Sequence, residues 1–192
     1  MGPAPIQDAL IGQLNLANPW GSGIASGAIN SLAIKQDPTT KSGWLYAASV
    51  NGGLWSSKYN GETDGFNPWQ WQSSSNDYIG AQSISKIEIT QNQKWLIAGR
   101  GKPSNFIGLS GNIADPLQVA EILDDGSLKW IANENGIQSS IIDTPITALE
   151  SVDELLIVGT YNKGLQVSSL NNAGKLQTIT PANLDLDPTT GN

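Results

Sequence analysis

A five-residue pattern occurs three times along the chain, and it constrains the fold more than any other feature of the sequence. Each copy has two large apolar residues, then a small pair, then a polar end: LYAAS at 45–49, LIAGR at 96–100 and LIVGT at 156–160. The starts of the copies lie 51 and 60 residues apart. Short segments that recur every 40 to 60 residues or so are typical of repeat architectures, in which one unit cannot bury its apolar face alone.

Each copy of the pattern lies within a longer series of strand-like segments. An alternating run precedes it, a glycine-bearing segment follows it, and a fourth short segment closes the unit. The flanking segments are 29–34, GGLWSS from Gly52 and 69–72; 84–89, FIGLS from Phe106 and 128–132; and 146–151, GLQVSS from Gly164 and 176–180. Turn residues bound these segments, and no window keeps a helical periodicity. We therefore predict an all-β, β-propeller-like fold of about three four-stranded antiparallel blades, with partial units at both ends.

The repeat divides the chain into five parts. The tetrapeptide Asp-Pro-Thr-Thr at 37–40 recurs at 187–190, where a further unit would make the same turn. Propellers usually have about 4 to 8 blades, so we expect a fragment of a longer protein or an intermolecular assembly. The predicted parts are an N-terminal segment with a candidate closing strand (1–26), blade one (27–80), blade two (81–143), blade three (144–181) and the start of a further blade or a linker (182–192).

The composition excludes several classes of function. There are 17 acidic and 10 basic residues, and Arg100 is the single arginine, so a nucleic-acid partner is not expected. Because Cys and His are both absent, Ser-His-Asp catalysis, Cys-His catalysis and the usual structural zinc sites are excluded within this chain. No apolar stretch is long enough for a membrane span, and the first residues do not read as a signal peptide. The low charge and the abundance of Asn, Ser, Thr and Gly favour an extracellular or cell-surface bacterial protein.

The first repeat unit resembles a known family. PWGSG at 19–23, INSLAI at 29–34, Asp37-Pro38 and LYAASVNGGLWSS at 45–57 are similar to the blade sequence of the BNR-repeat, sortilin-type β-propellers. That group includes the sialidases, the xyloglucanase-type glycoside hydrolases and the photosystem II assembly factor propellers. The resemblance is close over 20–57, looser over the next two units and absent at both ends. It implies a propeller of which this chain forms one part.

The family's Asp-box hairpin, Ser-x-Asp-x-Gly-x-Thr-Trp, is only partly kept. Ser57, Gly61 and Thr63 stand at the expected offsets, but Tyr59 replaces the aspartate. In the family this motif is a folding device, in which the acidic side chain satisfies turn amides. Its loss therefore weakens the assignment to a subfamily and has little bearing on activity.

Two enzymatic activities follow from the resemblance. Sialidase chemistry needs several arginines to hold a carboxylate, and Arg100 alone cannot supply them. Glycoside hydrolysis needs two carboxylates across a cleft, so the amino-terminal part of a xyloglucanase-like hydrolase remains the alternative function. Its candidate carboxylates are all near predicted loops, where solvated turn residues are the more common interpretation: Asp77, Asp115, Asp143 and Asp153.

The tryptophans fall into two groups. Those at equivalent places in the repeat are expected to pack between blades, namely Trp44, Trp55, Trp95 and Trp130. Trp20 lies in a glycine-rich turn, and Trp69 and Trp71 are two residues apart and share a face of their predicted strand. An indole can stack on a sugar and donate a hydrogen bond. We predict Trp20, Trp69 and Trp71 as ligand-binding residues.

Two acidic turns are candidate calcium sites. Asn60, Glu62 and Asp64 alternate around glycines, and Asp124 with Asp125 precedes Gly126. Calcium prefers such oxygen ligands, although neither spacing matches an EF-hand and most acidic turns bind no metal. Calcium is the one cofactor that the sequence suggests.

We predict a non-enzymatic β-propeller scaffold that mediates protein or carbohydrate binding, as a subunit or fragment of a larger extracellular bacterial assembly. Unpaired strands at blade edges would favour a protein partner or self-association, because they present unmet backbone donors and acceptors. A polysaccharide is the other expected partner.

Overall fold

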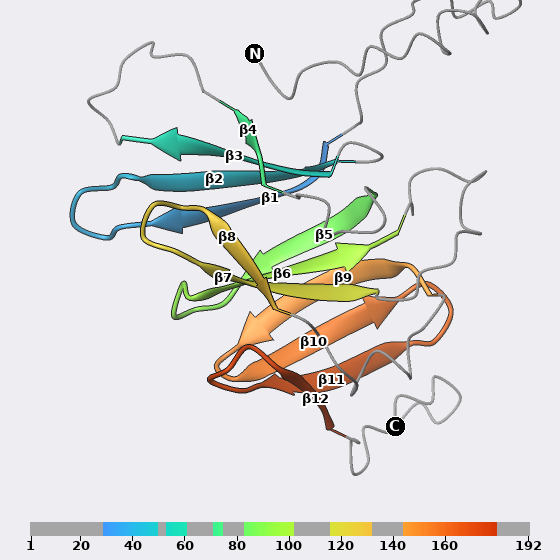
Figure 1. The fold of residues 1–192 in the computed structure, drawn as a ribbon. Helices are drawn as coiled ribbons and strands as arrows, with labels where there is room; N and C mark the ends of the chain where they lie inside the picture. The colour runs from blue at the N-terminus through green and yellow to red at the C-terminus, as the bar shows by residue number, and fades with distance from the viewer. Residues whose placement is uncertain are drawn as a thin grey trace, which may run out of the picture.

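The structure is a computed structural model that describes residues 29–49, 53–60, 71–74, 83–101, 116–131 and 144–179. These residues form three four-stranded antiparallel sheets and contain no helix, which confirms the predicted all-β, β-propeller-like fold (Figure 1). The first sheet has strands β1 (Ile29–Gln36), β2 (Gly43–Ser49), β3 (Gly53–Tyr59) and β4 (Gln72–Ser73). The second has β5 (Ile84–Ile89), β6 (Trp95–Arg100), β7 (Leu117–Ile122) and β8 (Leu128–Ile131). The third has β9 (Ile146–Val152), β10 (Leu155–Thr160), β11 (Leu165–Leu170) and β12 (Leu176–Ile179). Within the described ranges, no helix is long and apolar enough to cross a membrane.

Each sheet is a meander in which strands that follow one another in sequence are hydrogen-bonded neighbours. Short turns connect β1 to β2, β5 to β6, β7 to β8 and each pair of successive strands in the third sheet, as the alternating segments and their bounding Gly, Asn, Asp and Pro residues predict. The turn between β1 and β2 is the Asp-Pro-Thr-Thr tetrapeptide at 37–40. Local sequence is therefore sufficient to explain these hairpins, whereas the packing of the sheets depends on contacts between units.

The second sheet lies between the other two (Figure 1). Apolar side chains fill the space on both of its faces. Leu96 and Ala98 of β6 pack toward the first sheet, against Tyr46 and Leu54. Neighbouring residues on the same strand point to the opposite face. Ile97 accordingly packs toward the third sheet. Each pair of adjacent sheets thus has its own hydrophobic core.

The same β-bulge occurs in the first strand of every sheet. One extra residue interrupts the pairing of the first strand with the second: Asn30 in β1, Ser85 in β5 and Thr147 in β9. Because the bulge falls at the same place in each unit, it fixes which residues are equivalent. Tyr46, Ile97 and Ile157 then occupy one repeat position, and Leu45, Leu96 and Leu156 occupy the preceding one.

These equivalences give every sheet a forward face and a backward face. We define the forward face as the one that holds Tyr46, Ile97 or Ile157, and the backward face as the one that holds Leu45, Leu96 or Leu156. The forward face of the first sheet packs on the backward face of the second, and the forward face of the second packs on the backward face of the third. The stack is therefore directional.

One expectation at the level of single strands is wrong. The third strand of the second sheet is Leu117–Ile122, whereas the sequence suggested FIGLS from Phe106, a segment outside the described residues. Leu117 and Val119 are both buried toward the third sheet, and this long-range burial selects the strand. Trp55 follows Leu54 and so lies on the backward face of the first sheet, where it is half-buried. That it packs between blades stays a prediction, because no further sheet on this side belongs to the described residues.

The other structural tryptophans lie where the repeat predicts. Trp95 is buried in the core between the second and third sheets, and Trp44 and Trp130 pack against the core between the first and second. Trp130 also donates a hydrogen bond from Nε1 to the carbonyl of Ser74, at 3.1 Å, and so connects the second sheet to the first.

Candidate functional site

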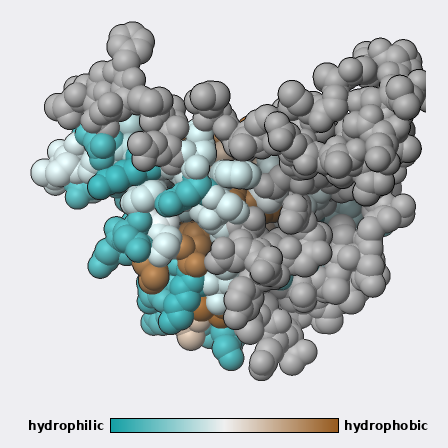
Figure 2. All heavy atoms as spheres, turned by 45° about the horizontal axis from the view of Figure 1, so that its top comes forward, coloured by the Kyte–Doolittle hydropathy of each residue, from teal (hydrophilic) through white to brown (hydrophobic). Residues whose placement is uncertain are grey.

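A groove of about 700 Å³ lies where hairpin turns of the first and second sheets meet. Its walls come from the β1–β2 hairpin, the end of β3, the β5–β6 turn and the β7–β8 turn. In Figure 2 the side where these hairpins gather is mostly hydrophilic, with hydrophobic residues between the polar ones. The side chains that give the groove its chemistry are Lys35, Gln36, Asp37, Trp44, Lys58, Gln93, Asp124 and Asp125.

Asp37 is fixed by the turn that it begins. Its Oδ1 accepts hydrogen bonds from the backbone amides of Thr39, at 2.7 Å, and Thr40, at 2.9 Å. An Asp-Pro start is typical of such turns, because proline presets the backbone and the carboxylate satisfies the free amides. Both bonds favour the charged form, and they hold the pKa of Asp37 below its usual value of 3.8.

Asp125 has the same role on the opposite wall. Its Oδ1 accepts hydrogen bonds from the hydroxyl of Ser127, at 2.6 Å, and from the Ser127 amide, at 2.9 Å. These bonds lower the pKa of Asp125 from 3.8. Asp124 is exposed beside it, and Gly126 completes the turn with a positive φ of 76°.

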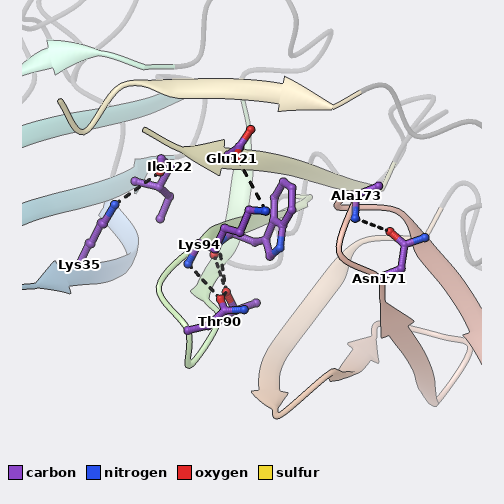
Figure 3. Close-up of polar contacts among 9 residues, drawn as sticks. Lys35, Thr90, Lys94, Glu121, Ile122, Asn171 and Ala173 are labelled. Atoms are coloured by element: carbon purple, nitrogen blue, oxygen red, sulfur yellow. Dashed lines mark hydrogen bonds and ion pairs between the residues drawn. The ribbon is translucent and has the colours of Figure 1, made fainter. Parts of the chain in front are cut away.

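Hydrogen bonds between the two sheets fix the geometry of the groove. The Nζ of Lys35 donates to the carbonyl of Ile122, at 3.4 Å (Figure 3). It also donates to the carbonyl of Leu123, at 3.5 Å. The amide of Gln36 donates to Oε1 of Gln93, at 2.9 Å. Since Lys35 and Gln36 belong to the first sheet and their partners to the second, the walls cannot move apart without loss of these bonds. The groove is therefore a largely preformed site.

The arrangement suits a polar ligand that forms several hydrogen bonds. Trp44 is half-buried at the groove and supplies an aromatic surface, while Lys58 is exposed at the end of β3. Amide, ammonium and carboxylate groups surround the indole, so both donors and acceptors are present. A low carboxyl pKa makes Asp37 and Asp125 poor proton donors near neutral pH.

The predicted ligand-binding and metal residues are only partly described. Trp20, Trp69, Glu62 and Asp64 lie outside the described residues. Trp71 is half-buried just before β4, and Asn60 is exposed just after β3. Asp124 and Asp125 line the groove. In the part of the chain that the structure describes, no three acidic side chains are close enough together to hold a metal, so the calcium sites stay predictions.

The candidate hydrolytic carboxylates do not meet in the described structure. Asp77, Asp115 and Asp143 lie outside the described residues. Asp153 is exposed in the β9–β10 turn, with a positive φ of 52°, as expected of a turn residue. The groove itself was not predicted, although the Asp-Pro-Thr-Thr turn that supplies Asp37 was a visible signal. Lys35 and Lys58 carried no such signal, because a lysine in a strand is ordinary.

Comparisons with known proteins identify a fold and no family. No family model matches the chain, and no curated protein is similar to it in sequence. A solved 6-phosphogluconolactonase-like protein from Bacteroides uniformis matches 81% of this chain with a TM-score of 0.52 and 15% identity. An exo-β-1,3-galactanase-like protein from Bifidobacterium bifidum matches 84% of the chain with a TM-score of 0.48 and 8% identity.

The chain corresponds to only about half the length of these solved structures. It covers 41% of the Bacteroides protein and 57% of the Bifidobacterium protein. Identity this low is informative about fold alone, so neither activity transfers to this chain, and the resemblance to BNR-repeat propellers stays a prediction. The three stacked meanders place the chain in the all-β, β-propeller-like fold class.

Proposed function

We propose that this protein is a non-enzymatic β-propeller-like scaffold that binds a polar ligand, with carbohydrate as the favoured class, in the groove between its first and second sheets. The observation that carries the proposal is the preformed groove, in which Trp44 lies among fixed hydrogen-bonding groups. Few rotamers need to be frozen when a ligand binds to such a site, so less affinity is lost to ordering.

The groove chemistry favours a sugar over an apolar or strongly anionic ligand. A sugar has an apolar face that can stack on an indole and hydroxyl groups that both donate and accept hydrogen bonds. Lys35 and Lys58 are balanced by Asp37, Asp124 and Asp125 around the groove, so the site has no strong preference for an anion. Neutral oligosaccharides fit this balance of charge.

The carboxylates at the groove support binding rather than hydrolysis. A glycosidase needs one carboxyl group with a raised pKa to protonate the leaving group. The turn hydrogen bonds of Asp37 and Asp125 shift their pKa values downward. We therefore favour the binding scaffold over the xyloglucanase-like hydrolase. The proposal includes an extracellular or cell-surface location within a larger bacterial assembly. The low-charge composition of the chain supports this location.

Tryptophan fluorescence titration with neutral oligosaccharides of glucose, xylose and galactose tests the proposal. We expect a saturable change in emission for at least one of them, and isothermal calorimetry should give the same affinity. Lys58→Ala should weaken binding, since the lysine is exposed at the groove and its truncation leaves the core intact. Lys129→Ala, at an exposed position of β8 away from the groove, is the matched control.

Trp44→Phe separates a ligand signal at the groove from one elsewhere. Phenylalanine keeps an aromatic ring in the core and removes the fluorophore, so the emission change should be lost while calorimetric binding is weakened. If no oligosaccharide produces a response at millimolar concentration, or if Trp44→Phe responds as the wild type does, the proposed site is wrong.

A further inference from the structure

Forward-face residues are buried in the first two sheets and exposed in the third. Two repeat positions show this most clearly, and their members in chain order are Tyr46, Ile97 and Ile157, and Leu54, Leu117 and Leu165. In the first and second sheets all of these side chains are 0% exposed. In the third sheet Ile157 is 36% exposed and Leu165 is 51% exposed. The third sheet thus presents a packing surface to which no described residue is docked.

The backward face shows the opposite trend. The equivalent residues are Ile29, Ile84 and Ile146 at one position and Leu32, Ile87 and Leu149 at another. In the second and third sheets these side chains pack in the cores, where Ile84 and Ile146 are 0% exposed. In the first sheet Ile29 is 43% exposed and Leu32 is 59% exposed. The first sheet therefore presents the complementary packing surface.

Both contacts inside the chain join a forward face to a backward face, and the two exposed faces are one of each kind. We infer that a second copy of this chain docks on them, so that the forward face of the third sheet in one copy packs on the backward face of the first sheet in the other. Two such contacts, related by a two-fold axis, close a ring of six sheets. This is a head-to-tail contact between different surfaces, which closes when the rotation between copies allows it.

A second copy fits these faces because they are the same repeat surfaces that already pack within each copy. Three strands about 4.8 Å apart and some 20 Å long present roughly 300 Å² per face, so two contacts would bury on the order of 1,200 Å² over both copies. That area is near the lower limit for a stable interface, about 1,200 Å². We therefore expect micromolar rather than nanomolar association. Face-to-face packing also differs from the edge pairing suggested by the sequence, because its affinity resides in apolar side chains.

One charged residue on the exposed forward face modulates this contact. Glu150 occupies the repeat position of Glu88, which accepts a hydrogen bond from the Ser151 hydroxyl of the next sheet at 2.8 Å. In the proposed contact the backward face of the first sheet packs on Glu150, and on that face Ile34 occupies the repeat position of Ser151. An apolar partner leaves the carboxylate unsatisfied, so Glu150→Ala should tighten association by several-fold.

Analytical ultracentrifugation of the full chain, from low micromolar to hundreds of micromolar, tests the inference. We expect a reversible shift from 20.3 kDa to twice that mass. Leu165→Glu and Leu32→Lys should each weaken dimerisation at least about tenfold, because each places a charge in an apolar contact. Leu123→Glu is the matched control, since Leu123 is 39% exposed in the β7–β8 turn, outside both faces. All three positions are exposed, and circular dichroism melts should show that the variants remain folded.

Mixing the variants distinguishes a head-to-tail contact from a symmetric one. A mixture of the Leu165→Glu and Leu32→Lys chains can form one contact with no substitution and another with paired charges, so dimers should reappear. If the dimer instead joined two forward faces or two backward faces, only one of the two substitutions would weaken dimerisation. A chain that stays monomeric at all concentrations, or a dimer that tolerates both substitutions, would overturn the inference. A mass that increases beyond two copies would show that the two contacts do not close a ring of two chains.

Discussion

The indole of Trp95 lies directly against Gly174, so that a Cβ added to the glycine would be 2.6 Å from Cζ3 of the ring. Trp95 belongs to the second sheet and Gly174 to the β11–β12 turn of the third. Gly174 also has a positive φ of 75°, a conformation that favours glycine. Trp44 and Gly126 repeat the same arrangement between the first and second sheets. A tryptophan on the turn glycine of the next sheet is thus a repeated element of the stack.

Gly174→Ala should destabilise the fold more than Gly164→Ala. Both glycines have positive φ, so alanine costs about 1–2 kcal/mol at either position from backbone strain. Nothing lies within 4 Å of a Cβ at Gly164, whereas a Cβ at Gly174 overlaps Trp95, which adds about 1–3 kcal/mol. The free energy of unfolding in urea measures the difference. Equal losses would show that the indole moves aside without cost.

Tyr46→Phe should lower the free energy of unfolding by about 0.5–1.5 kcal/mol. The buried Tyr46 hydroxyl donates to the carbonyl of Gly126 at 2.8 Å, and the substitution leaves that acceptor without its partner. Burial also raises the pKa of Tyr46, so its contribution is present below the usual value of 10.0 and is lost as the pH rises through the raised pKa. Tyr161→Phe, at a 54% exposed position, is the control and should change nothing.

The Glu88 carboxyl should make stability depend on pH. Desolvation raises its pKa from 4.5, and the hydrogen bonds from Ser151 partly oppose that shift. A raised pKa means that the stabilisation is fully present below the unfolded-state value and is lost as the pH rises through the folded-state value. Glu88→Gln should therefore abolish this loss, and Ser151→Ala should enlarge it. Urea unfolding at a series of pH values from 4 to 7 or so measures both effects. Parallel profiles for all three proteins would contradict the assignment.

Asp37 and Asp125 should titrate in the opposite direction. Their folded-state pKa values are held below 3.8 by hydrogen bonds from turn amides and hydroxyls, so they stabilise the fold above that pH. The stabilisation is lost as the pH falls through the lowered values. NMR titration of the two carboxyl carbons should give midpoints below 3.8. In the Asp37→Asn variant the loss of stability in acid should be smaller. A midpoint at or above the usual value for either residue would show that its turn opens in solution.

Much of the fold was visible in the sequence because propeller-like meanders are built from local hairpins. The second strands at 45–49, 96–100 and 156–160 were predicted, and each lies within β2, β6 or β10. The exception was β7, since Leu117–Ile122 and the segment from Phe106 are both short, strand-like runs. The choice depends on which run buries its side chains against the third sheet, and that sheet is made by residues far away in the sequence.

The candidate site was less visible for the same reason. The turns that carry Asp37 and Asp125 could be located from their residue types, because an acidic side chain next to free amides is a local preference. That they line one groove together with Trp44 and Lys35 depends on how the first sheet packs on the second. Neither spacing nor composition contains that information.

The sequence by itself determined the repeat, the strand-and-turn character of each unit and the exclusion of chemistry that needs Cys, His or several arginines. These follow from local preferences and from which residue types are present at all. Only the tertiary structure decided that Ile97 is covered while its equivalent Ile157 is exposed, and that Ile87 is covered while its equivalent Leu32 is exposed at the other end of the stack. Identical positions in a repeat differ in burial only through their neighbours, and the neighbours are set by packing between sheets.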